Sequence, residues 1–123
     1  MATFSRLEEI QVWQKARLVT RLIYQATSNG NFARDFGLRN QIQRASVSIM
    51  ANIAEGFGRR SDKEFANFLN MAHGSTSETQ SHLYVALDLN YIDDKSFHDI
   101  SMLLDEISRM TLALAQRLRG SQL

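Results

Sequence analysis

Hydrophobic residues recur every three or four positions through most of the chain, which is the spacing of one face of an α-helix. The pattern predicts four helices, over residues 7–27, 35–57, 62–89 and 94–119. It is clearest in the third, where one narrow stripe holds Phe65, Phe68, Leu69, Ala72, Thr76, Thr79, Leu83, Ala86 and Leu87. Nothing alternates with a period of two, so β-strands are not expected.

Short polar segments separate these helices and mark their ends. Ser61 and Glu64 have the spacing of a capping box, in which each side chain bonds the other residue's free backbone N–H. We expect Asn90 to end the third helix in the left-handed conformation and Asp93 or Asp94 to cap the fourth. Helices joined by such short connections must run antiparallel. The sequence therefore predicts an all-α fold, an antiparallel up-down-up-down four-helix bundle that forms one domain over the 123 residues.

The helix predicted over residues 35–57 is apolar around more of its circumference than a core-facing helix needs. A stripe of about 100° is enough to cover a core. The apolar positions here are Leu38, Ile42, Ala45, Val47, Ile49, Met50, Ile53, Ala54 and Phe57. The surplus predicts either central burial or a second interface, and we favour self-association.

The rest of this helix carries a line of polar residues spaced three or four apart. Its members are Gln41, Arg44, Ser48, Asn52, Glu55 and Arg59. Two interpretations are open: an ordinary solvent-exposed face, or a hydrogen-bonded seam at a contact with another helix or another subunit. Arg44 and Glu55 are about 16 Å apart along the helix axis, so they cannot pair within it.

The charge balance carries little information until the positions of the arginines are considered. The chain holds 14 Lys and Arg against 13 Asp and Glu, a net charge of +1. Any affinity for anions must therefore come from local clustering. Arg59, Arg60 and Lys63 adjoin the start of the third helix, where free N–H groups also favour anions. With Arg39 and Arg44 they are the candidate nucleic-acid-binding residues, which would contact phosphates without reading bases.

The sequence GFGRR at residues 56–60 superficially resembles a phosphate-binding loop. It lacks the G-x-x-x-x-G-K-[ST] spacing and no strand precedes it, which excludes a P-loop. We expect Gly56 and Gly58 to form a C-terminal helix cap, since glycine reaches positive φ without steric penalty. In the third helix Gly74 predicts a slight bend or the close approach of another backbone, because glycine lowers helix propensity.

Catalytic and metal chemistry find little support in the sequence. The absence of cysteine excludes disulfides, thiolate metal sites and a cysteine nucleophile. A di-metal carboxylate site needs Glu-x-x-His on two helices, whereas Glu78 and Asp94 precede His82 and His98 by four residues. No base is placed for serine or aspartate catalysis, and the Arg-x(4–6)-His pattern of some helical-bundle ribonucleases is absent. We expect no metal, no cofactor and no enzymatic activity.

Membrane association is not expected either. The longest aliphatic runs, such as LALA at residues 112–115, are far shorter than the roughly 20 residues of a membrane span. The first ten residues, MATFSRLEEI, lack the apolar run of a signal peptide. We therefore expect a cytoplasmic protein.

Three segments together resemble a known family. They are LEEIQVWQKARLVTRLIYQAT (7–27), FGLRNQIQRASVSIMANIAEGFGRRSDKEFANFLNMAHGSTSE (36–78) and LDLNYID (87–93). In order, they resemble the small bacterial four-helix bundle proteins encoded in intervening sequences of large-subunit ribosomal RNA genes. The family's motif positions fall at Arg44, Asn52, Glu55, Gly56, Arg59, Ser61 and Glu64. Met50 stands where the family usually has proline, so we expect the helix over residues 35–57 to be straighter here.

The resemblance implies an antiparallel four-helix bundle that assembles as a homopentameric ring. A distant branch serves as accessory protein to the reverse transcriptase of diversity-generating retroelements and binds enzyme and nucleic acid through a positively charged surface. We therefore predict a non-enzymatic homo-oligomer that binds RNA or DNA, or that scaffolds a nucleic-acid-processing protein. The alternative is a protein–protein interaction module without nucleic-acid binding, in which the polar seam and the arginines stabilise the oligomer.

Overall fold

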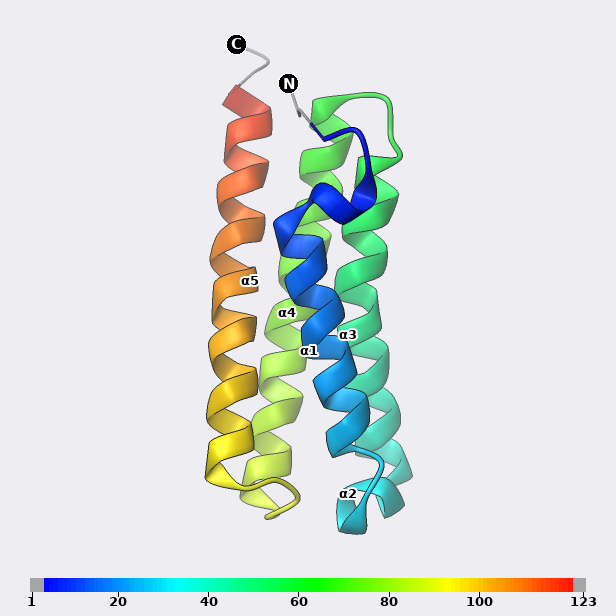
Figure 1. The fold of residues 1–123 in the computed structure, drawn as a ribbon, viewed down its shortest axis with the longest axis vertical. Helices are drawn as coiled ribbons and strands as arrows, with labels where there is room; N and C mark the ends of the chain where they lie inside the picture. The colour runs from blue at the N-terminus through cyan, green and yellow to red at the C-terminus, as the bar shows by residue number, and fades with distance from the viewer. Residues whose placement is uncertain (1–3, 121–123) are drawn as a thin grey trace.

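The computed structural model describes residues 4–120, and it is helical without any strand in that range (Figure 1). The elements, in chain order, are the 3₁₀-helix η1 (Leu7–Glu9) and the α-helices α1 (Gln11–Ala26), α2 (Gly30–Arg34), α3 (Phe36–Phe57), α4 (Asp62–Asp88) and α5 (Asp94–Gly120). The four long helices lie side by side, and the short α2 lies at the end of the molecule where α1 leads into α3. The described chain is thus an all-helical bundle.

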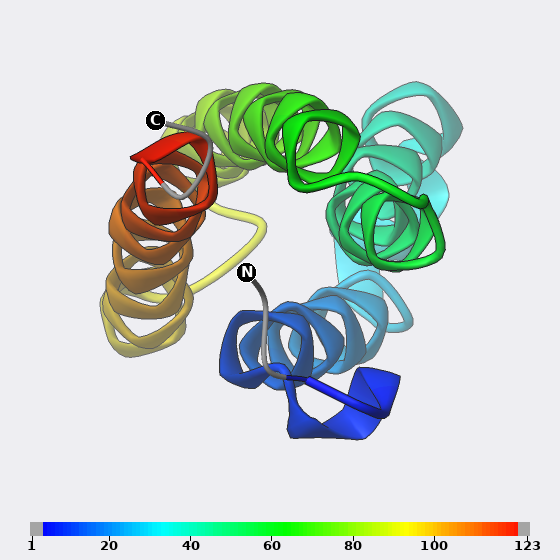
Figure 2. The same ribbon diagram turned by 90° about the horizontal axis from the view of Figure 1, so that it is seen from above.

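The long helices surround a common core. Helix α1 packs against α3 and α5, and α4 also packs against α3 and α5. Seen from above, the order around the core is α1, α3, α4, α5 (Figure 2), so the α1–α3 side and the α4–α5 side are opposite faces of the bundle. Fully buried aliphatic side chains from all four line the core, among them Val19, Ile49, Leu69 and Leu104. No helix within residues 4–120 has the length and apolarity needed to cross a membrane.

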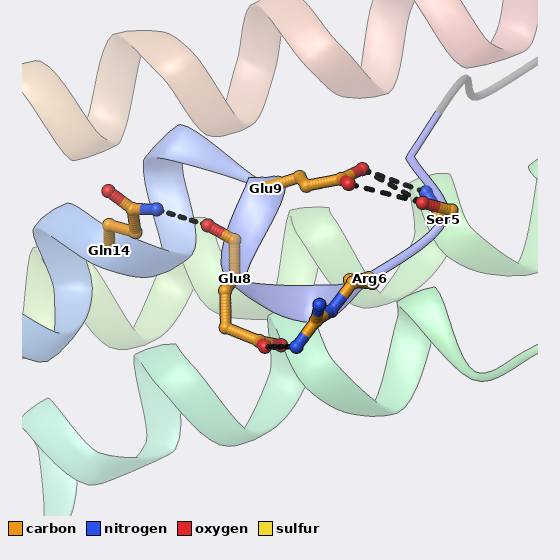
Figure 3. A network of polar contacts seen from close by, with 5 residues as sticks. All are labelled: Ser5, Arg6, Glu8, Glu9 and Gln14. Carbon is orange, nitrogen blue, oxygen red and sulfur yellow. Dashed lines mark hydrogen bonds and ion pairs between the residues drawn. The ribbon is translucent and has the colours of Figure 1, made fainter.

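The start of the chain differs from the single helix expected over residues 7–27. The 3₁₀-helix η1 comes first, and α1 begins only after Ile10, whose backbone is extended and whose side chain is buried. Figure 3 shows the polar contacts around η1: the Ser5 amide donates to Glu9 at 3.0 Å, and the Gln14 side chain donates to the carbonyl of Glu8. The bonds from Ser5 hold the pKa of Glu9 below its ordinary value. These contacts fix the bend that turns Ile10 into the core.

The link between α1 and α3 contains the extra helix α2, which the turn-rich residues 28–32 did not predict. Gly30 begins it with a φ of +62°, and Phe32 is buried. The Phe32 ring stacks on Tyr91, with centroids 5.3 Å apart. Asp35 then caps α3, accepting from the Leu38 amide at 3.1 Å and from the Tyr91 hydroxyl at 2.9 Å. A polar turn is therefore anchored by one buried aromatic residue.

The predicted end of α4 and the predicted cap of α5 are confirmed, and one of the two bonds of the capping box predicted at Ser61 and Glu64 is present. Asn90 follows α4 with a φ of 60°, in the left-handed region. The Ser61 hydroxyl accepts from the Glu64 amide at 3.1 Å at the start of α4. At the start of α5 the cap is Asp93, whose carboxylate accepts from the Ser96 amide at 2.7 Å. These local signals could be read from the sequence because each needs only neighbouring residues.

Gly58 is the C-terminal cap of α3, as predicted, but the positive φ expected there and the capping role expected of Gly56 are wrong. Gly58 ends the helix with a φ of −76°, and Gly56 lies buried within α3. A Cβ atom on Gly56 would lie 2.7 Å from the Cβ of Phe68 and 2.9 Å from Cδ1 of Phe65. Glycine is needed at residue 56 for the close approach of α3 and α4. Around Gly74, by contrast, no atom would lie within 4 Å of an added Cβ, so no close approach occurs there within residues 4–120.

Candidate nucleic-acid interface

Three cations gather where α3 leads into α4, and we call Arg59, Arg60 and Lys63 the basic corner. All three side chains are exposed. The Arg59 guanidinium bonds Glu55 at 3.2 Å and lies over the Phe68 ring, 4.8 Å from its centroid. Arg60 and Lys63 have no side-chain partner within residues 4–120. Contacts within the chain thus hold Arg59 in place, whereas Arg60 and Lys63 are available to bind an anion.

Acidic residues adjoin the basic corner and reduce its positive electrostatic potential. Asp62 and Glu64 lie in the first turn of α4, where their negative charges interact favourably with the positive end of the helix dipole. One backbone N–H of that turn is already taken by Ser61. The corner is therefore two free cations beside a capped helix start, and it needs support from charges elsewhere on the molecule.

The structure does not bring Arg39 and Arg44 together with the basic corner. Arg39 lies near the opposite end of α3, about 30 Å from Arg59 along the axis. Its guanidinium donates to the Ala33 carbonyl at 3.0 Å and lies over the Phe36 ring at 4.7 Å, so it closes the junction of α2 and α3. Arg44 is exposed, and its side chain has no partner in the described part of the chain.

Charge is segregated between the two sides of the bundle, a feature that sequence reasoning missed. Residues 1–60 hold nine Lys and Arg against four Asp and Glu, whereas residues 61–123 hold five against nine. Helix α1 contributes Lys15, Arg17 and Arg21 and no acid. The net charge of the whole chain conceals this uneven distribution, which a separate count of charged residues in each half of the sequence would have revealed.

The middle of the polar line on α3 is a contact with α4. The hydroxyls of Ser48 and Ser75 lie 2.9 Å apart, and the Asn52 amide donates to the Ser48 carbonyl at 2.9 Å and to its hydroxyl at 3.1 Å. All three side chains are partly buried. Gln41, Arg44, Glu55 and Arg59, towards the ends of the line, are exposed. Within one chain, the helix-contact interpretation holds for the centre and the solvent interpretation for the ends.

The histidines lie apart from one another. The His73 ring bonds the Ser108 hydroxyl at 2.9 Å between α4 and α5, and His82 lies 3.3 Å from Glu78 on its own helix. His98 lies in a groove between α4 and α5. In residues 4–120, no three histidine, aspartate or glutamate side chains come close enough to share a metal ion.

Within residues 4–120 the structure is a helical bundle with an aliphatic core and an uneven distribution of surface charge, and it shows no cluster of metal-binding side chains. Comparison with known proteins gives its family. Residues 8–113 match the family described as 23S rRNA-intervening sequence protein, and the chain belongs to this family. The resemblance inferred from the sequence is thereby confirmed. No curated protein matches the chain.

A solved structure supports the same assignment. It is the crystal structure of a protein of unknown function from the S23 ribosomal protein family of Bacteroides thetaiotaomicron. The two chains are 26% identical and superpose with a TM-score of 0.77, over 85% of this chain and 95% of that one.

Most of the motif positions have a structural role within the single chain. Gly56 permits close helix packing, Ser61 caps α4, and Asn52 bonds the backbone beside the α3–α4 contact. Glu55 and Arg59 pair with each other. Arg44 differs, because its exposed side chain makes no hydrogen bond or ion pair within residues 4–120. Helix α3 continues without interruption through Met50, at the position where the family usually has proline.

Proposed function

We propose that this protein is a non-enzymatic, homo-oligomeric bundle that binds the phosphate backbone of RNA or DNA, alone or together with a nucleic-acid-processing protein. The supporting observation is a group of exposed cations without hydrogen-bond or ion-pair partners in residues 4–120, which includes Arg44, Arg60 and Lys63. Such side chains suit phosphate contacts, which give affinity without sequence readout.

We assign the bundle the antiparallel up-down-up-down topology. The short links between consecutive long helices support it, since a chain that turns within a few residues must reverse direction. The colour gradients of Figure 1 also alternate in direction from one long helix to the next.

We further propose a homopentamer that acts in the cytoplasm. The resemblance to ring-forming relatives supports the assembly, as does the 42% exposure of Val47 on the broad apolar arc of α3. A ring would repeat one weak basic patch on every subunit, and this repetition would raise the overall affinity for a long polyanion. With this repetition, the two free cations of the basic corner in each subunit would be enough to bind a long polyanion.

The alternative function is a protein–protein interaction module that binds no nucleic acid. It is favoured by exposed apolar side chains that phosphate contacts would leave uncovered, such as Tyr24 and Val47. In that case the arginines would serve assembly or partner recognition.

The proposal is tested by reversing the free charges of the basic corner. The variant Arg60→Glu with Lys63→Glu spares Arg59, whose contacts with Glu55 and Phe68 support the fold. Binding of fluorescent structured RNA and duplex DNA is followed by anisotropy. We expect affinity to fall about tenfold or more, because each lost phosphate contact weakens binding. Unchanged affinity would overturn the role of the corner.

The matched control reverses two exposed cations at the other end of the bundle, Arg34→Glu with Lys95→Glu. It changes the net charge equally, and each residue makes only a local surface contact, with Asn31 and Asp99 respectively. We expect its affinity to stay within about threefold of the wild type, since long-range fields are screened by salt. Light scattering on every sample separates the two functions: a corner variant that loses its assembly supports the interaction module.

A further inference from the structure

One face of the bundle combines exposed apolar side chains with unpaired cations. On α1 it includes Arg17 and Tyr24, which share a helical stripe with Thr20. The Thr20 hydroxyl donates to the Ser46 carbonyl, which places this stripe beside α3. Val47, the residue after Ser46, is 42% exposed and Tyr24 is 45% exposed. We call this surface the α1–α3 face.

The cations of the α1–α3 face lack acidic partners in the described chain. Arg21 makes no side-chain hydrogen bond or ion pair there. Arg17 lies 5.9 Å from the centroid of the Trp13 ring, which orients its guanidinium without neutralising it. Glu8 of η1 lies near the upper part of this face, and its carboxylate is taken by Arg6 at 2.9 Å. The face therefore presents net positive charge around an apolar centre.

The opposite side of the bundle carries a groove of complementary character. It lies between α4 and α5, has a volume of about 360 Å³, and is lined by Tyr84, Phe97, Met102 and Asp105 among others. Tyr84 and Phe97 meet edge to face with centroids 5.0 Å apart. Tyr84 is 58% exposed and Met102 is 54% exposed, so the groove offers aromatic and thioether surface to a partner. We call it the α4–α5 groove.

Acidic residues flank the α4–α5 groove. Asp88 lies one turn beyond Tyr84 on α4, and Asp94 lies one turn before His98 on α5; both are exposed and have no side-chain partner within residues 4–120. Asp105, in the groove itself, is paired only with Arg109 on the same helix. The groove thus lies in the segment of the chain where acids outnumber bases.

We propose that the α1–α3 face of one copy docks in the α4–α5 groove of a second copy, in a head-to-tail contact. The inference rests on the self-association proposed above and specifies its two surfaces. Positive charge around Tyr24 and Val47 would face negative charge around Tyr84 and Met102. The two surfaces are thus complementary in charge, and each has an apolar centre that the other can cover. The two surfaces are on opposite sides of one bundle (Figure 2), so each copy offers one of each and the contact repeats from copy to copy.

A second copy fits the α1–α3 face better than nucleic acid does. Phosphates would satisfy Arg17 and Arg21 but would leave the apolar centre exposed. They would also leave the acidic groove on the far side without a partner. A second copy covers both surfaces with one contact, and the basic corner at the end of the bundle stays open for nucleic acid.

The test uses two variants, one with substitutions in the α1–α3 face and one with substitutions in the α4–α5 groove, which are measured separately and then mixed. The face variant is Arg17→Glu with Arg21→Glu, and the groove variant is Met102→Arg with Asp105→Arg. All four positions are exposed, and circular dichroism checks that each variant is folded. Light scattering is expected to show wild-type protein as an oligomer and each folded variant at the monomer mass. The basic-corner variant, which changes the net charge by the same amount as the face variant, serves as its control and is expected to keep the wild-type mass.

Mixing the two variants in equal amounts tests the head-to-tail arrangement. The mixture contains one intact face and one intact groove, so its mass is expected to rise above that of the monomer. A mixture that stays monomeric, or an oligomer that survives both variants, overturns this inference and leaves the proposed self-association standing. A monomeric wild-type protein overturns both. A face variant that remains oligomeric but loses RNA binding shows that the face is a nucleic-acid site instead.

Discussion

The backbone at Gly56 approaches Phe68 so closely that a Cβ on the glycine would lie 2.7 Å from the Cβ of the phenylalanine. This contact fixes the spacing of α3 and α4 just before the chain turns. The guanidinium of Arg59 lies over the Phe68 ring and also bonds Glu55. Helix packing at residue 56 therefore positions the basic corner.

Replacing Gly56 is expected to destabilise the fold. Gly56→Ala forces a methyl group against the Cβ of Phe68 and against the Phe65 carbonyl, which would be 3.2 Å away. Overpacking of this kind costs about 1–3 kcal/mol of the free energy of unfolding. Urea denaturation followed by circular dichroism measures it. An unchanged midpoint would contradict the close approach of α3 and α4.

The matched control for that variant is Gly74→Ala. Gly74 lies within α4 at a point where an added Cβ meets nothing within 4 Å. Alanine is favoured over glycine in a helix interior by about 1 kcal/mol. We expect the urea midpoint of this variant to rise. A fall would indicate that another copy or partner packs over Gly74.

The contact between Ser48 and Ser75 is expected to stabilise folding rather than assembly. Ser48→Ala removes the hydroxyl that Ser75 and Asn52 share. A neutral hydrogen bond contributes about 1 kcal/mol. A double-mutant cycle with Ser75→Ala should give a coupling energy of roughly that size, while light scattering shows an unchanged mass. Loss of assembly with little change in unfolding would place the seam between subunits instead.

The hydrogen bond between Tyr91 and Asp35 predicts a dependence of stability on alkaline pH. It raises the pKa of Tyr91 above its ordinary value. A group whose pKa is raised by folding stabilises the protein below its unfolded pKa, about 10 for tyrosine, and loses that contribution as pH rises through the folded pKa. Urea unfolding of the wild type should therefore weaken between pH 9 and 11 more than that of Tyr91→Phe.

A second variant controls for general alkaline effects. Tyr24→Phe removes an exposed hydroxyl for which the structure of residues 4–120 describes no hydrogen bond. Its loss of unfolding free energy over the same pH range should equal that of the wild type. The account of the Asp35 contact is wrong if Tyr91→Phe follows the wild-type profile too.

Periodicity and capping were sufficient to predict the all-helical fold. The stripe from Phe65 to Leu87 marked α4, and Ser61, Asn90 and Asp93 marked the ends of helices through bonds to near neighbours. The bend at Ile10 and the short α2 were missed. Both depend on one residue, Ile10 or Phe32, that is buried by contacts far along the chain, and periodicity does not contain such information.

The candidate site was harder to predict. Arg59, Arg60 and Lys63 are close together in the sequence, so grouping them needed no knowledge of the fold. Arg39, in contrast, bonds the Ala33 carbonyl at the α2–α3 junction. The role of Gly56 depends on the distance between α3 and α4, which the sequence does not show. Arg17 and Arg21 were overlooked because the near-zero net charge conceals how charge is divided between the two sides of the bundle.

The most direct test of the account is the salt dependence of nucleic-acid binding by the wild-type oligomer. Anisotropy of labelled structured RNA and duplex DNA is measured between about 50 and 200 mM salt, with the mass checked by light scattering. We expect affinity to fall by at least tenfold over this range, since each phosphate contact releases about one counterion. An intact oligomer that binds neither probe at the lowest salt concentration would contradict the proposed function.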